Sequence, residues 1–352
     1  MSDHAASAAP PTRFPWANLA EILTPLLLAL AAAGVVLAVA GHNPFEVYWL
    51  LAVESFGGTR RIAATLAAST PLILTGLATA VAFRAGAFNV GVEGCVFVGG
   101  LAAAWVGFSF TGLPAVALVP LALAAAVVVG AFWMLVPGLL KARLDVDEVV
   151  TTLMLNFIAI SLTAYLVNGP LLAPGSANSA TPMVAEAARL PKLMPPSTLN
   201  AGFLIAIALL VLYWWWSNRT ALGFETRIAG TNPRFATASG IDVPSLIIRM
   251  MLLSGAIGGV AGGIHALGTV GRFVSGFSPG YGFTGIAVAL LGRGSAIGIL
   301  LAALLFGALT TSGATIQLFS DVPIEIVNIL QGMVMIFAVA RFGWIFARRR
   351  RA

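Results

Sequence analysis

Few side chains in this sequence could do chemistry, and the most informative of them is Glu93. It lies between Gly91 and Gly94 in the largely apolar stretch FRAGAFNVGVEGCVFVGG. A carboxylate at membrane depth is costly, and it usually faces a cavity or an oppositely charged partner. The sequence therefore leaves two interpretations of Glu93. It lines a pathway, or it pairs with Arg84 in a structural role.

Two asparagines in apolar surroundings raise the same question. Asn89 shares the glycine-broken stretch with Glu93, and Asn156 lies within a later apolar run. Amide side chains at such positions either hydrogen-bond between helices or contact a substrate where glycines expose the backbone. Both interpretations stay open for both residues.

Patterns that would indicate catalysis or a cofactor are missing or lack their context. Cys95 is the only cysteine, and three scattered histidines have no metal-ligand spacing. The GYGFTG segment at 280–285 fits GxGxxG, but no βαβ unit surrounds it and the next acidic residue is Asp321. No GxxxxGK[ST] motif occurs. We expect this chain to bind no metal or cofactor and to hydrolyse no nucleotide.

The amino-acid composition indicates whether the protein lies in water or in a membrane. Of its 352 residues, 59% are apolar and only 9% are charged, whereas soluble domains carry roughly 25% charged residues. The net charge of +6 is spread thinly, and four of the arginines stand together at 348–351, so it does not indicate nucleic-acid binding. The chain is predicted to lie in a lipid bilayer.

The apolar runs define the fold class, because a helix needs about 20 apolar residues to cross the bilayer. The eighth run is too short to span and is flanked by Gly280, Gly282, Gly292 and Gly294, so it is predicted to be broken or re-entrant. We predict an all-α polytopic membrane protein with about ten transmembrane helices, one or two of them broken or re-entrant. The runs lie at 19–41, 62–83, 88–108, 114–137, 149–168, 201–217, 248–268, 282–292, 296–316 and 324–342.

Basic residues orient these spans, because they concentrate on the cytoplasmic side. With both termini inside, only Arg60, Arg61, Arg189, Lys192 and Arg272 fall outside. The predicted organisation is a cytoplasmic tail at 1–18, a transmembrane domain at 19–342 and a basic cytoplasmic tail at 343–352.

Two polar segments inside the membrane domain are long enough to carry a role. The proline-rich segment 169–200 is predicted to be an extracytoplasmic cap or loop. The cytoplasmic segment 218–247 contains a short helix-compatible stretch from Arg234 to Ser239, closed by Gly240. A short helix on such a segment indicates docking to a partner, and an ordinary solvated loop is the alternative.

Glycines at four-residue spacing mark a further packing face. Gly255, Gly259 and Gly263 repeat with this spacing, which lets another helix approach closely. That helix could belong to the same subunit or to another one.

Four motifs carry a resemblance to a known family. The chain resembles permease subunits of bacterial ABC importers of the branched-chain amino acid/ribose/simple-sugar class, and most closely the nucleoside (guanosine-type) uptake branch. The branch usually has a glutamine where this sequence has Cys95. The motifs are FNVGVEG at 88–94, DEVVTTLMLN at 147–156, AGTNPRFATASGID at 229–242 and GFTGIAVALLGR at 282–293.

The resemblance implies a transport subunit that is not an enzyme. Such a permease pairs with a second permease, here a different chain, in the bacterial cytoplasmic (inner) membrane. Two cytoplasmic ATPase subunits hold the ATP and Mg²⁺, and an extracytoplasmic binding protein delivers the substrate. The segment from Arg234 to Asp242 corresponds to the coupling helix that docks in the ATPase, so coupling is assigned to Asn232, Arg234, Ala238, Gly240 and Asp242.

The same resemblance implies that nucleosides cross by alternating access between the permeases. Phe88, Asn89 and Glu93 are expected to line the path, with Asn156 and Phe283 nearby, and an aromatic ring could stack on a nucleobase. One alternative is the same class of importer acting on a simple sugar such as ribose. Another is a secondary transporter driven by H⁺ or Na⁺, which predicts uptake that needs no ATPase.

Overall fold

The computed structural model describes residues 27–28, 30–175, 178–319 and 328–337. Its elements are helices, and β structure in these ranges is limited to two isolated bridges. Both predicted terminal tails, 1–18 and 343–352, lie outside the described residues. The labelled elements are α2 (Pro44–Phe56), α3 (Thr59–Arg84), α4 (Val92–Ser109), α5 (Ala115–Leu144), α6 (Glu148–Asn168), η1 (Glu186–Ala188), α7 (Gly202–Arg219), α8 (Ala221–Thr231), α9 (Pro233–Ala238), α10 (Val243–Ile264), η2 (His265–Val270), α11 (Tyr281–Leu291) and α12 (Ala296–Phe319).

The predicted spans correspond to helices in the structure. Among the described residues, seven helices are long and apolar enough to cross a membrane. The shorter apolar helices Leu30–Val39, Tyr281–Leu291 and Asn328–Phe337 account for the first, eighth and last predicted runs, so the all-α polytopic fold is confirmed. The short α11 lies where a broken helix was expected, because Gly280 before it and Gly294 after it both adopt positive φ.

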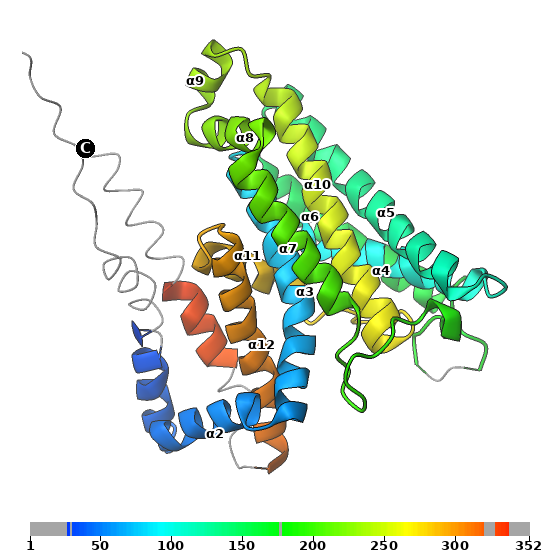
Figure 1. Cartoon of the computed structure of the whole chain (residues 1–352), viewed down its shortest axis with the longest axis vertical. Coiled ribbons are helices and arrows are strands. Elements are labelled where there is room, and N and C mark those ends of the chain that lie inside the picture. Colours follow the sequence, from blue (N-terminus) through cyan, green and yellow to red (C-terminus); the bar gives the residue numbers. More distant parts are fainter. Residues whose placement is uncertain (1–26, 29, 176–177, 320–327, 338–352) are drawn as a thin grey trace, which may run out of the picture.

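Two helices were not expected from the sequence. The α2 helix begins where the Asn43 side chain accepts a hydrogen bond from the Phe45 N–H and Pro44 occupies the first turn. It lies across the direction of α3 (Figure 1). The α8 helix occupies the first part of the polar segment 218–247, ahead of the short helix expected there, and the Thr220 side chain caps it.

The core of the bundle is built on close contacts of α10 with α4 and α5. A Cβ on Gly259 would lie 2.1 Å from the Ala126 carbonyl oxygen, and one on Gly262 would lie 2.0 Å from that of Val96. Any side chain at these positions would force the helices apart. The glycine face on α10 therefore packs within this subunit.

The two polar segments lie at opposite ends of the bundle. In Figure 1, α8 and α9 stand at one end, and the chain between α6 and α7 lies toward the other. At that other end the backbone N–H groups of Ala185 and Val184 donate to the carbonyls of Gly107 and Gly271. The described part of segment 169–200 thus packs over the ends of α4 and η2 as a cap.

Candidate substrate-path site

The chain leaves helical geometry between α3 and α4, and this break places the first motif. Gly86 has a φ of +82°, a value that suits glycine and ends α3. Residues 85–91 then form a loop, called here the 85–91 loop, before α4 begins at Val92. Backbone groups released by such a break must find partners inside the protein.

One face of α6 supplies those partners. Glu148, Thr152 and Asn156 are spaced by four residues, so their side chains lie on one side of the helix. Each of them bonds the segment 88–94. The contacts are Phe88 N–H to Glu148 Oε1 at 3.1 Å, Val90 N–H to Thr152 Oγ1 at 3.2 Å, Asn156 Nδ2 to the Val90 carbonyl at 2.9 Å, and Gly94 N–H to Asn156 Oδ1 at 2.8 Å.

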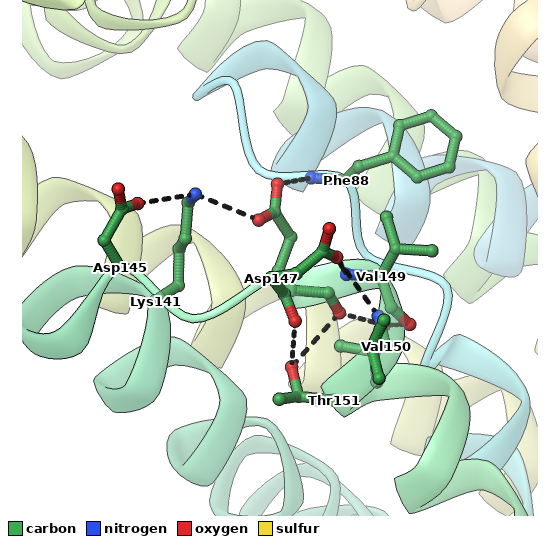
Figure 2. Close-up of polar contacts among 9 residues, drawn as sticks. Phe88, Lys141, Asp145, Asp147, Val149, Val150 and Thr151 are labelled. Carbon is green, nitrogen blue, oxygen red and sulfur yellow. Dashed lines mark hydrogen bonds and ion pairs between the residues drawn. The ribbon is translucent and has the colours of Figure 1, made fainter.

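The Glu148 carboxylate is shared between the loop and an ion pair. Its Oε2 lies 3.2 Å from Lys141 Nζ, and Lys141 also contacts Asp145 at 2.9 Å. Figure 2 shows Lys141 between Asp145 and the carboxylate that receives the Phe88 N–H. The ion pair fixes the rotamer of Glu148 and thereby the backbone of Phe88.

Asn89 is fully buried, and both polar atoms of its amide are hydrogen-bonded. Its Nδ2 donates to Ser254 Oγ at 2.8 Å, and the Ser254 hydroxyl donates to the Ala78 carbonyl at 2.7 Å. Its Oδ1 accepts from the Gly91 N–H at 2.7 Å. Asn89 thus ties the 85–91 loop to α3 and α10.

Glu93 connects α4 to the broken helix α11. Its side chain is 2% exposed, and one carboxylate oxygen accepts from the Gly282 N–H at 2.5 Å. Just before α11, the Gly280 N–H donates to Ser278 Oγ at 3.2 Å. A carboxylate is favourable at a helix N-terminus, where N–H groups have no partner within the helix. Arg84, the alternative partner, donates instead to the Ser217 carbonyl at 2.7 Å.

The two aromatic residues of the predicted path differ from the three polar ones. Phe88 is 40% exposed and Phe283 is 41% exposed, whereas Asn89, Glu93 and Asn156 are buried. The Phe88 ring stacks on Phe83 with centroids 4.3 Å apart. In this conformation the polar side chains hold backbone, and the two rings are left available for contact.

This arrangement is suited to binding and movement. The buried carboxylate and amides are occupied by backbone groups, and among the described residues no cluster of three His, Cys, Asp or Glu side chains could hold a metal ion. Exposed rings beside glycine-broken backbone offer flat faces to a planar solute.

The polar segment 218–247 forms two short helices, α8 and α9, and residues of the third motif cap α9 and the start of α10. Asn232 accepts from the Phe235 N–H at 3.0 Å at the start of α9, and Gly240 follows with a φ of +83°. Asp242 accepts from the Ser245 N–H at 3.2 Å and caps α10. Hydrogen bonds from Ser245 hold the pKa of the Asp242 carboxyl below its usual value.

The surface of α9 is almost wholly exposed. Ala236 is its buried anchor, while Arg234 and Ala238 are exposed and Phe235 is 56% exposed. Phe235 was not singled out from the sequence, although it directly follows Arg234 in the motif. An exposed phenylalanine beside an arginine is typical of a surface that docks to another protein.

The α8 helix brings this segment against the 85–91 loop. A Cβ on Gly230 would lie 2.3 Å from the Arg84 carbonyl oxygen and 3.0 Å from the Gly86 nitrogen. The end of α8 and the end of α3 therefore touch through backbone atoms. Movement of α8 toward the membrane would press directly on the loop that carries Phe88.

Three residues of this site were not identified from the sequence alone. Glu148 and Thr152 lie in the second motif, and their four-residue spacing with Asn156 was a signal for a common helical face. Ser254 lies among the glycines of α10 and carries no such signal. Its partner Asn89 is remote in the chain, and only the packing of α10 on α3 brings the two together.

The fold and the site define a class of protein. It is a multi-pass helical membrane protein with glycine-broken helices, whose buried polar side chains position backbone. The chain belongs to the family described as branched-chain amino acid transport system/permease component, whose model matches residues 61–339.

Relatives of known assignment cover almost the whole chain. A guanosine ABC transporter permease protein, NupP of Bacillus subtilis, is 38% identical over 93% of this chain and 95% of its own length. A glucose ABC transporter permease protein, TsgB13 of Haloferax volcanii, is 36% identical over 95% and 92%. A nucleoside ABC transporter permease protein, NupB of Lactococcus lactis, is 34% identical over 92% of each chain.

Proposed function

We propose that this protein is the permease subunit of an ATP-driven importer and forms part of a translocation path for nucleosides. The observation that carries the proposal is the contact chain from the exposed α9 through α8 to the 85–91 loop. This series of contacts ends where Glu93 bonds the N-terminus of α11. A force applied to α9 thus has a direct physical route to the two exposed rings.

The mechanism we propose is alternating access driven from the α9 end. Closure of the ATPase would press on α9, and the backbone contact at Gly230 would pass that movement to the 85–91 loop. Rigid elements joined by short loops carry such displacements because packed interfaces do not deform continuously. The loop and α11 would then shift relative to the second permease and open the path to the other side.

Contact with the substrate is assigned to the two rings. Stacking of a base on an aromatic side chain is worth about 1–3 kcal/mol, and Phe88 and Phe283 are the exposed aromatics of the site. Asn89, Glu93 and Asn156 are proposed to set the position of these rings and of the backbone beside the path. During the transport cycle the same groups could also meet the base or the ribose as the loop moves.

The partners follow from the proposed class of importer. They are a second permease of different sequence, two cytoplasmic ATPase subunits that hold ATP and Mg²⁺, and an extracytoplasmic binding protein. The complex would lie in the bacterial cytoplasmic membrane, with both termini of this chain and α9 on the inside. This chain itself would bind no ATP and no metal.

A simple sugar is the second candidate substrate. The TsgB13 relative is named as a glucose permease, and its identity to this chain is nearly that of NupP. Sugars also pack their apolar faces on aromatic rings, so the exposed phenylalanines fit both classes of solute. An ion-coupled secondary transporter is disfavoured by membership of the permease family.

The test is uptake of labelled guanosine, adenosine, ribose and glucose in cells that lack the gene and in cells that regain it. Loss and recovery of nucleoside uptake would support the proposal. Loss of sugar uptake with nucleoside uptake intact would assign the second candidate. A matched strain carrying an inactive ATPase partner should behave like the deletion, and uptake that persists there would contradict an ATP-driven importer.

A further inference from the structure

The chain between η2 and α11 is an irregular segment, residues 271–280, that runs from the cap toward Glu93. Where it begins, the Gly271 carbonyl accepts a hydrogen bond from the Val184 N–H of the cap at 3.0 Å. Where it ends, α11 starts, and the Gly282 N–H donates to Glu93 in the first turn of α4. The 271–280 segment thus connects the cap end of the bundle with the polar residues of the candidate path.

Aromatic side chains fix one face of this segment against α4. Phe273 and Phe277 are 1% and 3% exposed, and their rings stack with centroids 4.4 Å apart. Phe97 of α4 meets both rings edge-on at 6.2 Å. A Cβ on Gly100 would lie 2.4 Å from the Phe277 ring, so this ring fills the space beside the glycine. Because Gly100 is near the middle of α4, a helix long and apolar enough to cross a membrane, the segment lies at membrane depth.

The other face of the 271–280 segment is exposed and polar. Ser275, Gly276 and Pro279 are exposed, and they lie between and after the two buried phenylalanines along the chain. Within the described ranges, no hydrogen bond involves the Ser275 hydroxyl or the peptide N–H of Gly276. These groups are therefore left for a partner that the described residues do not supply.

Such a surface does not suit contact with lipid. Hydrocarbon offers no hydrogen-bond partner, so irregular backbone at membrane depth occurs only where protein buries it or where it lines a water-filled cavity. The exposed face of α6 differs, because it carries the apolar side chains of Phe157, Ile158 and Leu162. The centre of a protein interface would bury large apolar or aromatic side chains, whereas the exposed residues of the segment are small. A water-filled cavity is the environment that fits them.

The exposed face leads directly to an aromatic ring assigned to the substrate. Gly280 adopts a φ of +94°, and the Tyr281 N–H donates to Ser278 Oγ at 3.0 Å, which fixes the turn into α11. Phe283, 41% exposed, follows in the first turn of that helix. Hydroxyl and peptide groups followed by a ring match a solute that has both hydroxyl groups and a flat face.

We propose that Ser275, Gly276 and Pro279 line the cap-side half of the translocation path. There the Ser275 hydroxyl and the Gly276 peptide group contact hydroxyl groups of the solute. Both candidate substrates, a nucleoside and a simple sugar, carry such groups. The existence of a path rests on the proposed function, and the inference adds the segment that lines half of it.

The first test measures water at the segment in the assembled complex in nanodiscs. A small charged methanethiosulfonate reagent modifies thiols that water reaches. Ser275→Cys and Pro279→Cys should react, whereas Phe157→Cys, on the apolar face of α6, and the buried native Cys95 should not. If neither segment cysteine reacts faster than Phe157→Cys, lipid or another protein covers the segment, and the proposal is wrong.

The second test measures the contact with the solute. Ser275→Ala removes one exposed hydroxyl, so the complex should assemble with an unchanged unfolding temperature. We expect kcat/KM for uptake to fall by about 2- to 12-fold, the effect of losing a hydrogen bond of about 0.5–1.5 kcal/mol. Ser161→Ala removes an exposed hydroxyl from α6 and should leave kcat/KM unchanged. An unchanged kcat/KM in Ser275→Ala would contradict the contact.

A third measurement separates failure of this inference from failure of the proposed function. During turnover with ATP and the binding protein, guanosine or glucose, whichever the parent complex transports, should slow the reaction of Ser275→Cys. A reactive Ser275→Cys in a complex that transports neither solute would support the path and refute the proposed substrates. Transport of guanosine by the parent complex, with no effect of guanosine on the reaction, would leave the proposed function intact and overturn the contact at Ser275.

Discussion

At the scale of single residues, Glu93 is the clearest case of a charged group that serves the backbone. Replacing it by alanine leaves the buried Gly282 N–H group without this acceptor. Leaving a buried donor unsatisfied costs about 1–3 kcal/mol. We therefore expect Glu93→Ala to lower the unfolding temperature of the purified complex and to reduce uptake.

The conservative variant and a matched control define the role of Glu93. Glu93→Gln keeps an oxygen acceptor and should recover much of the thermal stability. Glu186→Ala removes an exposed carboxylate from η1, at the end of the bundle opposite to α8 and α9, and should change neither stability nor uptake. If Glu93→Ala abolished uptake with an unchanged unfolding temperature, Glu93 would be a substrate contact and its positioning role would be wrong.

Phe88 is proposed to contact the substrate through its aromatic ring, whereas Glu93 bonds the backbone. Its backbone N–H bonds Glu148 whatever the side chain, so Phe88→Ala should leave the 85–91 loop in place. Loss of one base-stacking contact, worth about 1–3 kcal/mol, corresponds to a rise of about 5- to 150-fold in the KM for nucleoside uptake. Transport assays over a range of guanosine concentrations measure this shift.

A second exposed phenylalanine is the control for Phe88. Phe110 is 43% exposed and contacts Trp105 at the far end of α4. Phe110→Ala should leave KM unchanged, and Phe88→Trp should keep it close to the original value. Equal KM values for Phe88→Ala and the parent protein would show that the Phe88 ring does not contact the substrate.

At the scale of elements, the contact of α8 with α3 leaves no room for an added methyl group at Gly230. Gly230→Ala would place a Cβ 2.3 Å from the Arg84 carbonyl oxygen and force α8 away from the loop. Coupling free energies are typically 1–3 kcal/mol, so we expect uptake to fall by about 5- to 150-fold. The ATPase activity of the assembled complex should persist, which is the signature of uncoupling.

A glycine without neighbours serves as the control for that substitution. A Cβ on Gly112 would meet nothing within 4 Å, so Gly112→Ala should leave uptake and ATPase activity unchanged. A Gly230→Ala complex with full uptake would show that the backbone contact does not transmit the movement.

The sequence predicts elements far better than it predicts the contacts between them. Hydrophobic runs located the spans because lipid forces each crossing backbone into a long apolar helix. The α2 helix was missed because Glu46 and Glu54 interrupt its apolar character, although Asn43 and Pro44 gave a capping signal. The support that α6 gives to the segment 88–94 could not be predicted from the sequence, because it depends on which helices pack together.

At the scale of the whole molecule, the two ends of the bundle differ in the segments that they carry, and the proposed orientation assigns each end to one side of the membrane. The segment 169–200 packs over one end, and α8 and α9 stand at the other (Figure 1). The backbone of Arg84 meets Gly230 at the end of α8, and the positive-inside rule predicts that basic residues such as Arg84 lie on the cytoplasmic side. The proposed orientation puts Lys192 outside and Ser239 inside.

Single cysteines test this orientation in intact cells. Lys192 and Ser239 are both exposed, while the native Cys95 is buried and should stay unlabelled. A membrane-impermeant maleimide should label Lys192→Cys in intact cells and should reach Ser239→Cys only after permeabilisation. The reverse labelling pattern would show that the chain has the opposite orientation. The α9 helix would then lie outside, where no cytoplasmic ATPase could press on it. Because the parent protein measures any labelling of Cys95, the two variants decide the side of the membrane on which coupling takes place.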